Sequence, residues 1–189
     1  MTVAPRPDSV LDEHKAAVPR PDSVPIEHKA TAPRSIGCFV LTVSDSKTPG
    51  TDTSGTLIRE LLVGAGHTVV GHAIARDEPT QVAAIIRDGC ENPALQAFIL
   101  TGGTGVTSRD STFEAVEALL DKRLTGFGEL FRMLSYPEIG AAAMLSRAQA
   151  GVVKRRALFS LPGSPNACRL ALEKLIIPEL GHLLREISR

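Results

Sequence analysis

The chain has 189 residues, in which 21 Lys and Arg balance 21 Asp and Glu. That length suits one domain of moderate size, with an appendage at most. Proteins that bind DNA or RNA through the phosphates need an excess of positive charge, so the balanced charge argues against wholesale nucleic-acid binding. The longest uncharged runs, 61–75 and 92–108, are shorter than the roughly 18 residues of a membrane-spanning helix, so we expect no membrane insertion.

The cysteines and the first residues bear on the cellular compartment. Cys38, Cys90 and Cys168 are far apart along the chain and form no CxxC pair and no metal-binding spacing. Free cysteines usually behave as small hydrophobic residues, so we expect reduced, buried thiols; a reactive thiol is the less favoured alternative. Pro and Asp stand near the start, where a signal peptide needs an apolar stretch. We therefore expect a cytoplasmic protein.

The N-terminal segment, residues 1–35, contains a tandem repeat. Pro5–Val10 returns as Pro19–Val24, and Glu13–Ala16 returns as Glu27–Ala30, each 14 positions later. Six of the 13 prolines lie in this segment, which has no glycine and no aromatic residue. Such a composition cannot bury enough apolar surface to offset the entropy of ordering the chain. We expect this tail to be disordered or loosely extended.

Residues 36–189 form the predicted domain, because all 16 glycines and all seven aromatic residues lie there. Apolar periodicity and capping residues define its elements. In chain order, the first are a strand at 36–43, a helix at 53–65, a strand at 67–76, a helix at 79–90 and a strand at 97–100. A helix at 111–121 follows and begins with a capping box of Ser111 and Glu114, and a helix at 126–144 is broken around Pro137. The last are a hairpin of 152–153 and 157–161 and a C-terminal helix that is capped by Ser164 and kinked or restarted at Pro178. The alternation of strands and helices predicts a three-layer α/β (αβα) fold with a mostly parallel central sheet.

Three loops that follow strands share a small, polar and acidic character: 42–46, 76–79 and 101–112. In a parallel sheet all three lie at the edge formed by the carboxyl ends of the strands, where ligands bind in such folds. Their convergence is the main indication of a functional site.

The third loop begins with the glycine-rich run Thr101–Gly105. Its three glycines let backbone N–H groups approach a ligand without a Cβ in the way, and oriented N–H groups form a cradle for anions. The helix that starts near Ser111 adds its positive end. The run is neither a P-loop nor a dinucleotide fingerprint, because Ser108 replaces the last glycine of the latter. We favour the anion cradle over a simple packing turn because Arg109 and Asp110 follow at once.

Two carboxylates lie in these loops, Asp77 and Asp110. Either one alone is explained by turn or capping chemistry. Together, beside a phosphate cradle, they suit a hydrated Mg²⁺, which takes one or two carboxylates plus substrate phosphates. The segment 161–165 is either a second anion-binding helix start or a well-capped connection, two alternatives that stay open here. His67, His72 and His182 show no ligand spacing, and we interpret them as structural.

These motifs, in one order, resemble the MoaB/MogA molybdopterin-binding family of molybdenum cofactor biosynthesis. The resemblance spans about 36–180 and rests on Asp52–Gly55, Thr101–Gly105 with Arg109-Asp110, Gly126–Glu129, Phe131-Arg132, Leu145–Ala148 and Leu161–Pro165. The run 131–140 is closer to the MoaB branch. The resemblance implies a three-layer fold, a homotrimer or trimer-based hexamer, and molybdopterin adenylyltransferase activity with Mg²⁺, ATP as co-substrate and molybdopterin as substrate.

The resemblance also implies roles for individual residues. The family's two catalytic aspartates match Asp77 and Asp110, which would hold the Mg²⁺. Some MoaB proteins lack the Arg-Asp pair and are inactive, and this chain keeps it, which favours activity. The implied substrate-binding residues are Ser44, Asp45, Thr101, Gly102, Gly103, Thr104, Gly105, Arg109, Glu129, Arg132, Pro162, Gly163 and Ser164.

Two other functions fit the same sequence features, because function belongs to the site and not to the fold. One is a non-catalytic molybdopterin-binding or carrier protein that works with other molybdenum cofactor biosynthesis proteins. The other is a phosphate-binding regulatory or scaffold domain that needs no Mg²⁺.

Removal of residues 1–34 should leave the fold and ligand binding nearly intact, because the tail has few apolar anchors. Thermal unfolding of the truncated and full-length chains tests this expectation. A large drop in the melting temperature would show that the tail packs on the domain or joins a subunit contact.

Overall fold

The structure is a computed structural model that describes residues 33, 35–107 and 110–189. The predicted disorder of the tail and the predicted role of Arg109 lie outside the described residues. Within the described ranges, no helix is both long and apolar enough to cross a membrane.

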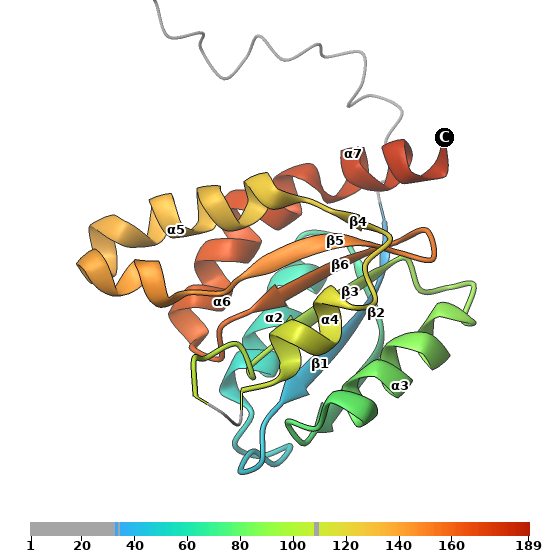
Figure 1. The fold of residues 1–189 in the computed structure, drawn as a ribbon. Helices are drawn as coiled ribbons and strands as arrows, with labels where there is room; N and C mark the ends of the chain where they lie inside the picture. Colours follow the sequence, from blue (N-terminus) through green and yellow to red (C-terminus); the bar gives the residue numbers. More distant parts are fainter. Residues whose placement is uncertain (1–32, 34, 108–109) are drawn as a thin grey trace, which may run out of the picture.

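A six-stranded sheet forms the centre of the domain (Figure 1). The strands lie in the order β2-β1-β3-β6-β5-β4; β2, β1, β3 and β6 are parallel to one another, β5 is antiparallel to β6, and β4 is antiparallel to β5. Their bounds are β1 Gly37–Val43, β2 Thr68–Ala75, β3 Ala97–Thr101, β4 Lys122–Arg123, β5 Gln149–Val153 and β6 Arg156–Leu161. The mostly parallel central sheet predicted from the sequence is confirmed.

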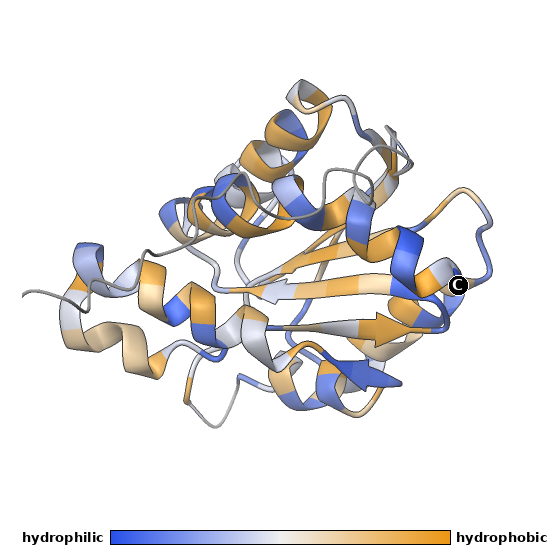
Figure 2. Ribbon diagram, turned by 90° about the horizontal axis from the view of Figure 1, so that it is seen from above, coloured by the Kyte–Doolittle hydropathy of each residue, from blue (hydrophilic) through white to orange (hydrophobic). Residues whose placement is uncertain are grey.

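Helices cover both faces of the sheet, as expected for three layers (Figure 1). One face carries α2 Thr53–Gly64, α5 Thr125–Ile139, α6 Pro165–Ala171 and α7 Ile177–Ser188, and the other carries α3 Pro79–Cys90 and α4 Thr112–Glu117. Successive residues of a strand point to opposite faces, so Cys38 and Val40 join the first core and Leu41 and Val43 the second. Strands buried on both faces read as continuous apolar runs, as the colouring of Figure 2 shows.

The three cysteines are buried free thiols, as the sequence predicts. Burial raises the pKa of Cys38 to about 12 and that of Cys168 to about 11. Both thiols are therefore protonated at neutral pH, and neither has the thiolate character that a reactive cysteine needs.

One buried carboxylate, that of Asp52, links three elements of the first βαβ unit. It accepts from the backbone N–H of Gly55 (2.9 Å) and so caps α2. It also accepts from Thr42 Oγ1 of β1 (2.7 Å) and pairs with His72 Nε2 of β2 (3.0 Å). These bonds give His72 the structural role expected for it.

The predicted capping box of α4 is wrong. The helix covers only Thr112–Glu117, and the side chain of Ser111 makes no capping bond to it. Ser111 instead donates from both its N–H and its hydroxyl to Asp77, while Glu114 pairs with Arg147. The carboxylate of Asp77, from the loop after β2, therefore accepts the hydrogen bond from the Ser111 N–H that Glu114 was predicted to accept.

Proline affects the two long helices differently. The helix α5 continues through Pro137 to Ile139, so the predicted break at Pro137 is wrong. It breaks at Gly140, whose φ of 60° is incompatible with a right-handed helix, and a 3-10 helix follows at Gly140–Leu145. The kink or restart predicted at Pro178 corresponds to a π-helical turn, Leu172–Ile176, that precedes α7, and Pro178 lies in the first turn of α7.

The predicted hairpin is confirmed and consists of β5 and β6. Its two-residue turn, Lys154-Arg155, has positive φ at both positions, 42° and 63°. Tight hairpins require this left-handed backbone because it matches the twist of the strands.

The double variant Lys154→Asn/Arg155→Gly places in the turn the two residues that adopt positive φ most easily, so it should raise the melting temperature. Each kcal/mol of backbone strain that is removed should raise it by about 2–4 °C. An ordinary residue with left-handed backbone costs about 1–2 kcal/mol. The lost Lys154–Glu91 pair is exposed, and such pairs contribute about 0–1 kcal/mol. Thermal unfolding measures the change, with Lys154→Gln as the control that removes only the ion pair. A lower melting temperature in the double variant would mean that the side-chain contacts outweigh the strain.

Candidate functional site

The loops after β1, β2, β3 and β6 meet at one edge of the sheet, as the parallel topology predicts. The N–H of Ser44 donates to the carbonyl of Ala75 (2.8 Å), and that of Gly102 donates to Leu161 (3.0 Å). Gly163 packs beside Gly102, because a Cβ on Gly163 would lie 3.5 Å from the Cα of Gly102. These bonds fix the loops relative to one another before any ligand arrives.

The glycine loop, Thr101–Gly105, has no room for side chains at its three glycine positions. Gly102 and Gly103 have φ of 100° and 62°. A Cβ on Gly102 would overlap the carbonyl oxygen of Val43, and one on Gly103 would overlap Thr112 Oγ1. A Cβ on Gly105 would lie 2.5 Å from Asp110 Oδ2. Only backbone can occupy this path, as an anion cradle requires.

Asp77 lies on one side of this loop. Its Oδ1 accepts from the N–H of Ser111 (3.3 Å), from Ser111 Oγ (3.1 Å) and from Thr112 Oγ1 (3.0 Å). Its Oδ2 faces Gly103, where a Cβ would come within 2.7 Å. The carboxylate therefore holds the start of α4 with one oxygen and borders the cradle with the other.

Asp110 closes the loop from the other end. Its Oδ2 accepts from the N–H of Thr107 (2.9 Å) and from Thr107 Oγ1 (2.6 Å). These hydrogen bonds, with the nearby Arg147 guanidinium, hold the pKa of Asp110 below its usual value. The carboxylate is therefore ionised at neutral pH, as a cation ligand must be.

Arg147 lies within the family motif Leu145–Ala148, but no role was predicted for it from the sequence. Its guanidinium donates to the carbonyls of Thr104 (3.2 Å), Gly105 and Asp110 (3.0 Å). It also pairs with Glu114 and lies 4.9 Å from the centre of the Phe113 ring. Its position in the sequence, just before β5, could have indicated that it lies at the site. Because β5 is antiparallel to β6, β5 begins at the same edge of the sheet at which β6 ends.

Several of the predicted site residues make hydrogen bonds that hold the loops in place instead of pointing toward a ligand. Thr101 and Thr104 are buried, so any contact with a ligand must come from their backbone. Thr101 Oγ1 donates to the carbonyl of Pro162 (3.0 Å), and Ser54 Oγ donates to that of Gly163 (2.7 Å). Ser164 caps α6 through Ala167. This geometry favours the well-capped connection over a second anion site at 161–165.

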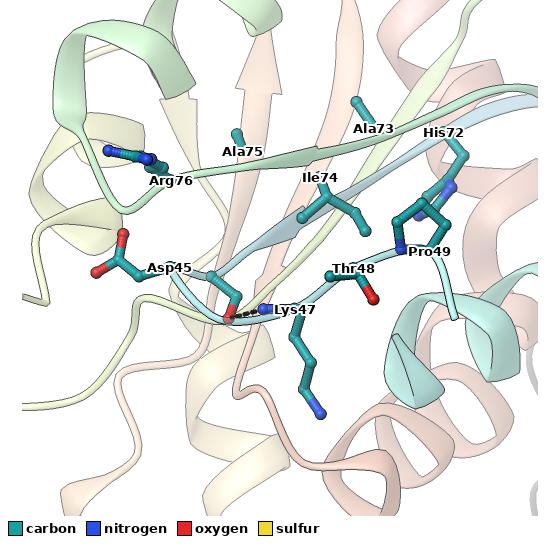
Figure 3. A pocket seen from close by; sticks show the side chains of 10 residues that line it. Asp45, Lys47, Thr48, Pro49, His72, Ala73, Ile74, Ala75 and Arg76 are labelled. Atoms are coloured by element: carbon teal, nitrogen blue, oxygen red, sulfur yellow. Dashed lines mark hydrogen bonds between the residues drawn. The ribbon is translucent and has the colours of Figure 1, made fainter. Parts of the chain in front are cut away.

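Two cavities lie near this edge of the sheet, one beside the ends of β1 and β2 and the other beside the start of β5. The first, of about 450 Å³, includes Ser44, Asp45, His72 and Arg76 (Figure 3), and the N–H of Lys47 donates to Ser44 Oγ across its floor. The second, of about 440 Å³, lies between α4, α5 and β5 and includes Glu129, Arg132 and Arg147. The predicted residues Ser44 and Asp45 thus line one cavity, and Glu129 and Arg132 line the other.

The donor set suits a cation that arrives with a ligand. Among the described residues, no group of three or more His, Cys, Asp and Glu side chains could enclose a metal ion. Magnesium needs fewer, since one or two carboxylates plus substrate phosphates complete its shell. Asp77 and Asp110, which flank the glycine loop, fit that description.

Comparisons with known proteins agree with this geometry. Residues 39–182 match the family model described as "Probable molybdopterin binding domain". A protein named molybdenum cofactor biosynthesis protein B, from Halalkalibacterium halodurans, is 49% identical over 156 residues, which cover 82% of this chain and 92% of the relative.

Two solved structures are similar over most of the chain. A crystal structure of a molybdenum cofactor biosynthesis protein B has a TM-score of 0.81 and 49% identity, covering 84% of this chain and 99% of that one. The tungsten cofactor synthesizing protein MoaB from Pyrococcus furiosus has a TM-score of 0.74 and 38% identity, covering 84% and 100%. The chain therefore belongs to the molybdopterin-binding domain family of molybdenum cofactor biosynthesis, on its MoaB branch.

Proposed function

We propose that this protein is a molybdopterin adenylyltransferase, which uses Mg²⁺ and ATP to form adenylated molybdopterin and pyrophosphate. The observation that carries the proposal is the placement of two carboxylates, Asp77 and Asp110, on either side of a side-chain-free glycine loop. Two cavities near the same edge of the sheet give room for two substrates, whose phosphates would meet at the glycine loop.

The reaction needs no general base. A phosphate oxygen of molybdopterin forms a bond to the α-phosphorus of ATP, and the bond from that phosphorus to the β-phosphate oxygen breaks, releasing pyrophosphate. The second pKa of a phosphate monoester is about 6, so the nucleophile is already ionised at neutral pH. The barrier lies in bringing several negative charges together, which positioning and electrostatic stabilisation lower.

The residues divide this work between them. The N–H of Gly102 donates to Leu161 and that of Gly105 faces Asp110, so the N–H groups of Gly103 and Thr104 would cradle phosphate oxygens. Asp77 and Asp110 would hold the Mg²⁺, which would supply positive charge beside the phosphates. We propose that Arg109 neutralises further charge and that Glu129 and Arg132 contact substrate in the cavity that they line.

The variant Asp110→Asn should fold and bind molybdopterin but lose about a hundredfold or more in turnover, the effect of removing one key electrostatic group. The amide is almost the same size and can still accept from Thr107, but it lacks the charge. Asp77→Asn should behave similarly, and the double variant should lose less than the sum of the two if both carboxylates serve one metal ion. The assay is Mg²⁺-dependent adenylyl transfer from ATP to molybdopterin, with molybdopterin binding measured separately.

Asp88→Asn is the matched control, because Asp88 is an exposed aspartate on α3, away from the loops. Unchanged turnover in Asp110→Asn would contradict the catalytic assignment. A wild-type protein that binds molybdopterin tightly and never releases pyrophosphate would instead be a carrier.

We also propose that the protein is a homo-oligomer, a trimer or a trimer-based hexamer. Six of the eight exposed large apolar side chains within the described residues lie on α5 and the 3-10 helix that follows it: Leu130, Met133, Tyr136, Ile139, Met144 and Leu145. A patch of this kind on a soluble domain is typical of a protein interface.

Sedimentation at micromolar concentration should give a mass of three or six chains. Met133→Glu should shift that mass toward the monomer, because it places a charge within the exposed apolar patch. A wild-type monomer would contradict the proposal.

A further inference from the structure

We propose that Arg147 is a positioning residue that orients two peptide groups, 104–105 and 110–111, so that their N–H groups bind the two catalytic carboxylates. The inference rests on the proposed function for its catalytic meaning. The geometry itself is independent of that function.

A peptide group is planar and trans, so its C=O and its N–H point in opposite directions. A donor that fixes the carbonyl therefore also fixes the direction of the N–H. Arg147 binds carbonyls on the far side of the loop from the cradle, and the N–H groups of the same peptides face the aspartates.

The first peptide joins Thr104 and Gly105. Its carbonyl accepts from Arg147 Nε (3.2 Å). Gly105 packs against the Asp110 carboxylate, since a Cβ on Gly105 would lie 2.5 Å from Asp110 Oδ2, and its N–H helps to lower the pKa of that group. One side of this peptide thus contacts the guanidinium and the other contacts a catalytic carboxylate.

The second peptide joins Asp110 and Ser111. Its carbonyl accepts from Arg147 Nη2 (3.0 Å), and its N–H, on Ser111, donates to Asp77 Oδ1 (3.3 Å). The same guanidinium nitrogen also donates to the carbonyl of Gly105. Arg147 therefore reaches both aspartates through one intervening peptide group each.

The guanidinium is itself held in place before a ligand binds. Glu114 pairs with Nη1, and the plane of the group lies over the Phe113 ring. A planar fork with several donors can hold three carbonyls at once, whereas a lysine ammonium is a single point on a flexible stem. Lysine at this position keeps the charge and loses the geometry.

Three variants test the proposal. In Arg147→Lys, the amides of Gly105 and Ser111 should exchange hydrogen at least about tenfold faster by NMR, and kcat for adenylyl transfer should fall about a hundredfold, more than any change in KM, as misplaced catalytic groups do. Glu114→Gln removes the ion pair but leaves the carbonyl bonds, so it should change both quantities less than about threefold. Arg169→Lys on α6, a comparable exposed ion pair with Glu173, controls for the substitution itself.

Each outcome decides the matter. Unchanged exchange of the two amides in Arg147→Lys overturns the proposal, whatever the activity. Faster exchange with unchanged kcat overturns its catalytic part, and an effect of Glu114→Gln as large as that of Arg147→Lys assigns the role to the ion pair instead. If the wild-type protein transfers no adenylyl group, the proposed function fails, while the amide exchange still decides whether Arg147 orients the loop.

Discussion

The close passage of the glycine loop over the end of β1 is the constraint on which the site depends. With no atom beyond Cα at Gly102 and Gly103, the chain can turn between Val43 and Thr112 and still keep its hydrogen bond to Leu161. That path sets where Asp77 and Asp110 stand relative to the cradle. A single methyl group at either glycine would push apart the loops that carry them, so we regard the two carboxylates and the loop as one unit.

Much of the architecture could be predicted because it follows from local rules. Apolar runs bounded by Gly, Pro and capping residues marked the strands β1, β2 and β3 and the helices α2 and α3 to within about two residues at most ends. The parallel order of those strands then placed Asp77 and the glycine loop at a common edge without further information. The loops themselves pointed to Asp77 and Asp110, and the family resemblance added the prediction that both are catalytic.

The rest depended on contacts between segments that are distant in the sequence. The prediction of a capping box was wrong because Ser111 donates to Asp77, which lies 34 positions earlier, and not to Glu114. The sequence around Ser111 carries no sign of this distant acceptor. Arg147 lay within a family motif, but its contacts were not predicted because the loops expected at this edge were those that follow parallel strands. In a mixed sheet, an antiparallel strand starts where its neighbours end, so the residues that enter β5 are brought to the same edge as those that leave β3. The carboxylate of Asp52 likewise met His72 only through the pairing of β1 with β2.

The network around Asp52 also bears on how the chain folds. All of its partners, Thr42, Gly55 and His72, belong to the first βαβ unit, so the bonds that close this unit span short stretches of sequence. Pairing β3 with β6 brings together Ala97 and Ala157, a much longer loop to close. Contacts between near neighbours form faster than distant ones, so we expect β1, α2 and β2 to assemble first and to offer β3 an edge on which to add. We therefore expect the candidate site to form last, when the hairpin of β5 and β6 adds to the sheet and Arg147 contacts the glycine loop.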